Sequence, residues 1–163
     1  MKKLFIFLLF ITSIHVFSQE SIKDVLKKYN TESVPYIYAD SLRKISSDVI
    51  LLDARERSEF KVSHLKGALF VGYDKFSLKK TIKNLPNKNA KIIVYCSLGV
   101  RSEDIAEQLK SAGYTNVQNL YGGIFEWKNK GNRVFSKGKE TNKVHAFNQE
   151  WSKWLLKGEK IYE

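Results

Sequence analysis

The chain has 163 residues, of which 43% are hydrophobic and 13% aromatic, so it can bury a sizeable core and is neither collagen-like nor disordered in composition. The formal net charge is +11, but the lysines are scattered and do not form a basic stripe with interleaved aromatic residues. We therefore expect a solvated cationic surface and no nucleic-acid partner. Apolar runs outside the N-terminus fall short of the roughly 20 residues of a membrane span, which predicts no stable membrane insertion of the mature protein.

The first residues are typical of an export signal. A positively charged start precedes the apolar core of residues 4–11, and a small residue at a possible cleavage site follows at Ser18. Residues 1–18 are therefore predicted to be a signal peptide, with cleavage after Ser18 or Gln19 and export to a periplasm. The alternative is an uncleaved anchor, for which the apolar core is short.

Alternating strands and helices are predicted after this segment. Residues 19–33 form a helical extension that begins at a capping box of Ser21 and Asp24. A short strand and helix are expected in residues 34–45. Continuous apolar runs then indicate buried strands in residues 48–54, 67–73, 91–96 and 116–122. Helical patterns occupy residues 74–85, 101–114 and 122–131 between them. This order favours an α/β domain with a parallel sheet over residues 34–131.

The C-terminal residues 132–163 are predicted to be a basic linker followed by an amphipathic helix. Residues 132–144 are hydrophilic and indicate a loop. Residues 146–158 place Phe147, Trp151 and Trp154 on one helical face, which we expect to pack against the sheet domain.

The chain contains a single cysteine, Cys96, at the carboxyl end of an apolar run. Ligands of open parallel sheets bind at this edge. The next residues turn through Gly99, reach Arg101 and open a helix, so backbone N–H groups, the helix N-terminus and a guanidinium would stabilise a thiolate. A buried structural cysteine before an ordinary helix cap is the alternative.

Three separated motifs resemble the rhodanese domain of single-domain sulfurtransferases. They are "LLDARERSEFKVSHLKGALFVGY", "VYCSLGVRSEDIAEQLKSAGY" and "NVQNLYGGIFEW", and they occur in the family's order. The resemblance covers residues 34–131 and implies a five-stranded parallel sheet wrapped by helices, here with an extra C-terminal helix.

The resemblance also implies a mechanism. The Cys96 thiolate would take the outer sulfur of a small anionic donor such as thiosulfate, and cyanide or a thiol, either a small molecule or a protein thiol, would remove it. Arg101 would steer the anion. The backbone of the loop would cradle it, through Ser97, Leu98, Gly99, Val100 and Ser102.

Two other functions remain open on the same scaffold. Four residues separate Cys96 from Arg101, whereas phosphatases and arsenate reductases of this fold carry one residue more. The shorter loop suits a sulfur atom on cysteine better than a tetrahedral oxyanion, which favours sulfur transfer over both of these activities. A binding or sensing module without turnover is the remaining alternative.

Supporting residues are expected near the loop. Asp53 could hydrogen-bond the loop or orient Arg101, or could instead cap the turn that follows its strand. Arg55 could assist at the pocket or form a surface pair with Glu59. We expect His64 to be structural. Because one cysteine and two histidines remain after cleavage, we expect no metal site and no cofactor.

Overall fold

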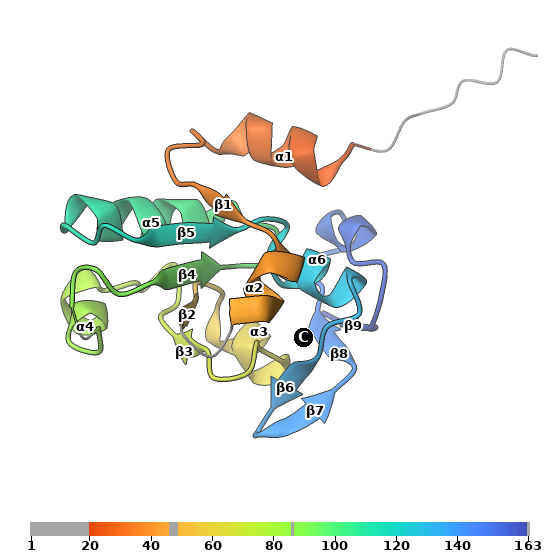
Figure 1. Ribbon diagram of the computed structural model, residues 1–163. Helices are drawn as coiled ribbons and strands as arrows, with labels where there is room; N and C mark the ends of the chain where they lie inside the picture. Colours follow the sequence, from red (N-terminus) through yellow and green to blue (C-terminus); the bar gives the residue numbers. More distant parts are fainter. Residues whose placement is uncertain (1–19, 46–48, 86, 163) are drawn as a thin grey trace, which may run out of the picture.

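A five-stranded parallel sheet forms the centre of the computed structural model, which describes residues 20–45, 49–85 and 87–162 (Figure 1). The strand order is β1-β5-β4-β2-β3, and every pair is parallel. The strands are β1 (Tyr36–Ile37), β2 (Ile50–Asp53), β3 (Leu69–Phe70), β4 (Ile92–Tyr95) and β5 (Val117–Leu120). This arrangement confirms the predicted α/β class, and it puts β4, the strand before Cys96, in the middle of the sheet.

Helices cover both faces of the sheet, so its strands carry apolar residues on each side. They are α1 (Ile22–Tyr29), α2 (Ala39–Ile45), α3 (Arg57–Val62), α4 (Leu78–Ile82), α5 (Arg101–Ser111) and α6 (Gly123–Asn129). Along β4, Ile93 and Tyr95 join the core under α2 and α6, whereas Ile92 and Val94 join the core under α4 and α5. Alternate residues of this buried strand therefore pack into two separate hydrophobic cores, one on each face of the sheet. Among the described residues, no helix is both long and apolar enough to cross a membrane.

The N-terminal helix α1 packs on the loop that follows β4. The predicted capping box is present, because Ser21 Oγ accepts from the Asp24 N–H and the Asp24 carboxylate accepts from the Ser21 N–H. Leu26 is buried, and its side chain lies beside Gly99. Asn30 follows the helix and donates a 3.0 Å hydrogen bond to the Gly99 carbonyl. The extension is thus tied to the cysteine loop, whereas the predicted signal peptide before it lies outside the described residues.

The prediction of a linker over residues 132–144 is wrong. This segment forms an antiparallel hairpin of β6 (Val134–Ser136) and β7 (Lys139–Thr141), followed by β8 (Lys143–His145). Its two-residue turn, Lys137 and Gly138, has positive φ at both positions, as type I′ hairpin turns require. Each of these strands has only three residues, too few to show the apolar alternation by which sequence identifies a strand.

The predicted C-terminal amphipathic helix is also wrong, and of the three residues on its predicted apolar face only Trp154 is buried, whereas Phe147 is exposed. The segment holds only a 3₁₀ turn, η1 (Trp151–Trp154), before β9 (Glu159–Ile161) pairs in parallel with β8. Phe147 has φ +67°, which no α-helix allows, and Asn148 caps the turn by accepting from the Trp151 N–H at 2.8 Å. Trp154 and Leu155 still pack into the core.

Candidate active site

Cys96 lies at the carboxyl end of β4, where the chain turns into α5. The thiol is 2% exposed, and the backbone N–H of Gly99 donates to its Sγ at 3.1 Å. Gly99 has φ +111°, a conformation that a side chain rarely tolerates, so glycine is needed to aim this N–H at the sulfur. The sequence predicts backbone donors in this loop, and the Gly99 N–H is one of them.

Ser102 also lies close to the sulfur, and its hydroxyl has two acceptors within reach. Its Oγ is 3.6 Å from Cys96 Sγ and 2.7 Å from the side-chain oxygen of Asn119. A hydroxyl has one proton, so Ser102 can donate to only one of these acceptors at a time. The Asn119 amide donates in turn to the Gly99 carbonyl at 2.7 Å. Asn119, on β5, therefore holds the glycine whose N–H meets the sulfur, a role that its place in a strand pattern did not reveal.

Replacing Asn119 with alanine is expected to lower the free energy of unfolding by about 2 kcal/mol, because it removes the buried partner of both Ser102 and the Gly99 carbonyl. The cysteine loop should also become easier to cleave with a protease. The matched control is Gln118→Ala on the same strand, which should change stability by less than about 1 kcal/mol. Equal losses in both variants, measured by denaturant unfolding, would contradict this role for Asn119.

Arg101 is held by Glu59, a residue of α3. Its guanidinium donates to the two carboxylate oxygens at 2.8 and 2.9 Å and to Ser97 Oγ at 3.0 Å. Ser97 Oγ donates to the same carboxylate at 3.0 Å. Burial opposes the charge on Glu59, but the hydrogen bonds and positive charge of Arg101 outweigh it and lower the Glu59 pKa to about 2. For Arg101, burial is likewise outweighed by Glu59 and by the charge of Cys96, so its pKa is raised.

This depressed pKa predicts a specific loss of stability in acid. The Glu59 pKa falls from 4.5 to about 2 on folding, so its contribution is fully present above pH 4.5 and is lost as the pH drops toward 2. The loss should be about 3 kcal/mol of unfolding free energy. In Glu59→Gln this part of the pH dependence should vanish, whereas Glu150→Gln, at an exposed position, should keep it. Urea unfolding at pH 6, 4 and 3 measures the slope, and identical slopes in all three proteins would refute the assignment.

Asp53 and Arg55 do not take the places expected for them. Asp53 accepts hydrogen bonds from the backbone and side chain of Arg55, and the Arg55 guanidinium also donates to the Ser63 carbonyl at 2.6 Å. Both side chains are fully buried. Asp53 therefore caps its own turn and does not orient Arg101, and Arg55 is not a surface residue. Asp53 and Arg55 are two residues apart in the same turn. They therefore pair with each other and not with a residue that follows the neighbouring strand.

The apolar side chains of the loop are turned away from a ligand of Cys96, as a cradle made by the backbone requires. Leu98 is fully buried and packs into the core, and Val100 is partly buried against the same core. Only their backbone could contact a ligand of Cys96. His64 is structural, as predicted: its Nδ1 lies 3.0 Å from the Phe60 carbonyl, and its ring stacks on the Phe60 ring.

The chain that follows β5 passes directly behind Cys96. Ile124 donates from its backbone N–H to the Cys96 carbonyl at 2.9 Å, and Phe125 donates to the Ser97 carbonyl at 3.2 Å. A Cβ on Gly123 would lie 2.3 Å from the Cys96 carbonyl oxygen. The glycine pair Gly122 and Gly123 therefore lets α6 dock its N-terminal turn against the cysteine loop.

The C-terminal segment reaches the same site. The guanidinium of Arg101 lies 4.8 Å from the centre of the Phe147 ring, and Phe147 is 38% exposed. Its backbone N–H donates to His145 Nδ1 at 3.1 Å, which requires that nitrogen to be unprotonated. Burial lowers the pKa of His145, in agreement with a neutral ring. The predicted helical pattern gave no sign that the Phe147 ring would lie against Arg101.

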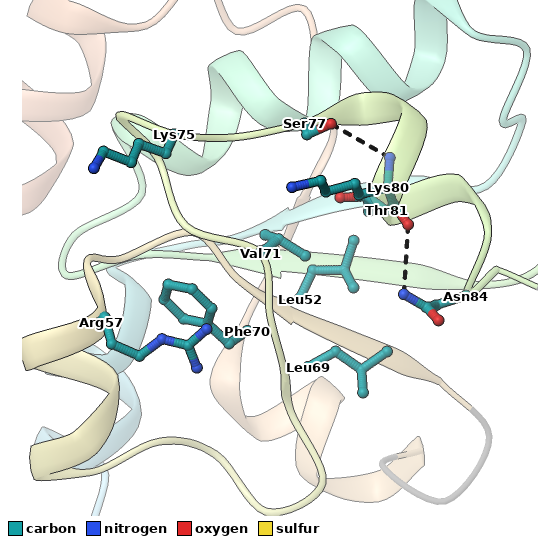
Figure 2. A pocket seen from close by; sticks show the side chains of 10 residues that line it. All are labelled: Leu52, Arg57, Leu69, Phe70, Val71, Lys75, Ser77, Lys80, Thr81 and Asn84. Carbon is teal, nitrogen blue, oxygen red and sulfur yellow. Dashed lines mark hydrogen bonds between the residues drawn. The ribbon is translucent and has the colours of Figure 1, made fainter.

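The surface cavity in Figure 2 is distinct from this site. It has a volume of about 440 Å³ and lies beside β3, between Arg57 on one side and Lys75 and Lys80 on the other. Leu52 and Val71 form its floor, and the Ser77 hydroxyl accepts from the Lys80 N–H inside it. Cys96 is not among its lining residues, so the chemistry of the thiol must be sought at the loop itself.

Comparisons with known proteins agree with this geometry. The family profile described as Rhodanese-like domain matches residues 38–130. A tRNA uridine(34) hydroxylase from Enterobacter sp. (strain 638) is 34% identical over 83 residues, which are 49% of this chain and 24% of that protein. The matched region thus makes up about a quarter of the length of these curated relatives.

Two solved structures extend the likeness to the fold. A rhodanese-related protein from Thermoplasma volcanium is 27% identical, with a TM-score of 0.55 over 62% of this chain and 97% of that one. A thiosulfate sulfurtransferase from Pseudomonas aeruginosa is 21% identical, with a TM-score of 0.60 over 82% of this chain and 25% of that one. At that identity the second match supports the fold alone. The profile spans more than half of the residues of this chain, and the three sequence motifs fall in the family's order. The chain therefore belongs to the rhodanese-like domain family.

Proposed function

We propose that the protein is a sulfurtransferase that carries a sulfane sulfur on Cys96. The observation that carries the proposal is the 3.1 Å hydrogen bond from the Gly99 N–H to Cys96 Sγ, within a loop that leaves four residues between Cys96 and Arg101. A single backbone donor aimed at sulfur stabilises a thiolate and, after loading, a persulfide. The rhodanese-like family is compatible with this chemistry.

The reaction has two displacement steps. The Cys96 thiolate attacks the outer sulfur of a donor, a new S–S bond forms, and the donor's own bond to that sulfur breaks, with its electron pair leaving on sulfite when the donor is thiosulfate. An acceptor such as cyanide or a thiol then attacks the outer sulfur of the persulfide and leaves with it. Cys96 is returned as thiolate, so no external oxidant or reductant is required.

Intact-mass measurement tests the proposal. The full chain is incubated with excess sulfane donor, either thiosulfate or inorganic polysulfide, and then with cyanide. We expect the mass of one added sulfur atom on Cys96, removed by cyanide with release of thiocyanate. If neither donor adds sulfur and thiocyanate does not form, the protein is not a sulfurtransferase.

Other functions lead to different results in the same preparations. A phosphatase or arsenate reductase would show Cys96-dependent turnover of an aryl phosphate or of arsenate, and the short loop argues against both. A binding module without turnover would retain its biological activity in Cys96→Ser. Hydroxylation of tRNA belongs to relatives in which the region matched by this chain makes up about a quarter of the length.

We further propose that the protein is exported to a periplasm through a signal peptide of residues 1–18. The support is the sequence alone, a charged start before an apolar core. Periplasmic fractions should contain a chain that begins at Gln19 or Glu20, as determined by N-terminal sequencing. Recovery of the full-length chain from the cytoplasm would refute this proposal and leave the enzymatic one intact.

A further inference from the structure

We infer that a groove outside the cysteine loop binds an extended acidic segment of a partner protein. The groove consists of two surface cavities that share one lining residue, Arg57 of α3. The first is the cavity beside β3 in Figure 2, of about 440 Å³; the second, of about 1120 Å³, is lined by α3 and the C-terminal strands. Together they form the cationic groove, whose charged lining residues are Arg57, Lys61, Lys75, Lys80, Lys137 and Lys143.

The charge of this groove is the first observation. Within the described ranges, no acidic residue lines either cavity. Lys143 pairs with Glu159 at 3.8 Å, but both side chains are more than half exposed, so the pair contributes little. Glu56 and Asp74 stand next to lining residues in the sequence without lining a cavity themselves. Six cations against these three carboxylates leave an excess of three positive charges, which an acidic ligand would complement.

Arg57 joins the two cavities. Its guanidinium lies 3.7 Å from the centre of the Phe70 ring, and Phe70 meets the Phe60 ring edge-on at 5.4 Å. Phe70 lines the first cavity and Phe60 lines the second, so the cavities adjoin across this contact. A guanidinium stacked on a ring keeps its N–H groups directed sideways, where they can bind a carboxylate through two hydrogen bonds. Arg57 is therefore the central anchor of the groove.

The helix α3 separates the roles of its two faces. Arg57 and Lys61 are one turn apart and exposed, whereas Glu59 between them is buried and binds Arg101. Cys96 lines neither cavity. A segment bound in the groove would thus lie on the outer face of the helix that holds Arg101 and would leave the thiol uncovered.

The spacing of the cations fits an extended chain better than a small anion. They come from α3, α4 and the loop before it, the hairpin turn and β8, and Figure 2 places Arg57 and Lys80 on opposite sides of the first cavity. Apolar side chains lie among them, including Leu69, which is 43% exposed, and Ile161. An extended peptide offers carboxylates and apolar groups at alternate positions, which matches this mixed lining.

Two other polyanions fit the groove less well. Single-stranded nucleic acid binds through bases stacked on open aromatic faces. Here the Phe60 ring is already stacked on His64 at 4.1 Å, and the Phe70 ring carries Arg57. An anionic membrane presents a broad surface that cannot enter cavities of this size. The observations therefore favour a protein segment.

Peptide binding tests the inference on the full chain. The probe is a fluorescein-labelled peptide of about ten alternating glutamate and leucine residues with blocked ends, which spans about 33 Å when extended. Fluorescence anisotropy should give a Kd on the order of 10 μM. The same peptide with serine in place of leucine should bind about tenfold more weakly, because it leaves the apolar lining without a partner.

Neighbouring lysines provide matched variants. Lys79 and Lys80 are both exposed on α4, but only Lys80 lines the groove, so Lys80→Glu should raise the Kd about tenfold and Lys79→Glu less than twofold. In the second cavity, Lys61→Glu should raise it about tenfold, whereas Lys139→Glu, outside the groove, should not. Arg57→Glu should have the largest effect, about 30-fold, since Arg57 contributes to both cavities.

The results separate the groove from general charge and from the enzyme. Equal weakening in Lys79→Glu and Lys80→Glu, or no binding of the peptide below about 1 mM, overturns the inference. An effect of Lys80→Glu without one of Lys61→Glu overturns a single continuous groove. Tighter binding of oligothymidylate or of phosphatidylglycerol vesicles than of the peptide assigns the surface to another partner and overturns it as well. Sulfur loading of Cys96 should be the same in wild type and Lys80→Glu, so a failure of sulfur transfer leaves this test intact.

Discussion

Cys96→Ser is expected to abolish sulfur loading, with a fall of about 10³-fold or more to the level of the buffer reaction. The hydroxyl of serine is far less acidic than a thiol, so the Gly99 N–H cannot hold it as an anion at neutral pH. The measurement is the intact mass after incubation with a sulfane donor, together with thiocyanate release on addition of cyanide.

The serine variant should still fold. Serine is close to cysteine in size, and its oxygen can accept from the same Gly99 N–H, so the melting temperature should stay within a few degrees of wild type. Ser111→Ala serves as a second control, because it removes an exposed hydroxyl at the end of α5 without touching the cysteine loop. Sulfur that remained bound to a folded Cys96→Ser protein would show that another group accepts it, and the proposed mechanism would be wrong.

Gly123→Ala is expected to lower the free energy of unfolding by about 4 kcal/mol, enough to unfold a marginal domain. The new Cβ would lie 2.3 Å from the Cys96 carbonyl oxygen and 2.6 Å from the Ser97 carbonyl carbon and oxygen. These are backbone atoms of the loop after β4, so they cannot yield as the end of a flexible side chain can. The residue also has φ +53°, which adds strain for alanine.

The matched control for this clash is Gly131→Ala. Gly131 also has positive φ, +79°, but a Cβ there meets no atom within 4 Å. Only the backbone strain remains, and the expected cost is about 1 kcal/mol. Chemical denaturation of both variants separates the close approach from the conformational preference, and similar losses at the two positions would contradict the docking of α6 on the cysteine loop.

Much of the fold could be predicted because its signals are local and periodic. The run before Cys96 is apolar at every position, as a central parallel strand covered on both faces must be. The capping box of Ser21 and Asp24 predicted the start of α1 for the same reason, since a span of four residues holds the whole signal. Prediction from periodicity failed for the C-terminal segment. Its aromatic residues fit a helical face, yet Phe147 at φ +67° and the pairing of β8 with β9 replace the helix.

The candidate site divides in the same way. Cys96, Gly99 and Arg101 lie within a few residues of one another in one loop. The sequence by itself therefore determined the type of chemistry to expect. Asp53 shows the limit of that reasoning. It stands at the end of the strand beside β4, but it pairs with Arg55 in its own turn, and Glu59 from α3 takes the arginine instead.

The amino-acid sequence alone determined the α/β class, the strand before Cys96 and the place of Cys96 at the carboxyl end of that strand, because periodicity and short-range spacing are properties of the chain itself. Only the tertiary structure decided which carboxylate neutralises Arg101, that Asn119 holds the glycine beside the sulfur, and that Phe147 covers the guanidinium. Those contacts join residues far apart in sequence, so no local pattern specifies them. They form only when the packed core brings β4, β5, α3 and the C-terminal segment to one edge of the sheet.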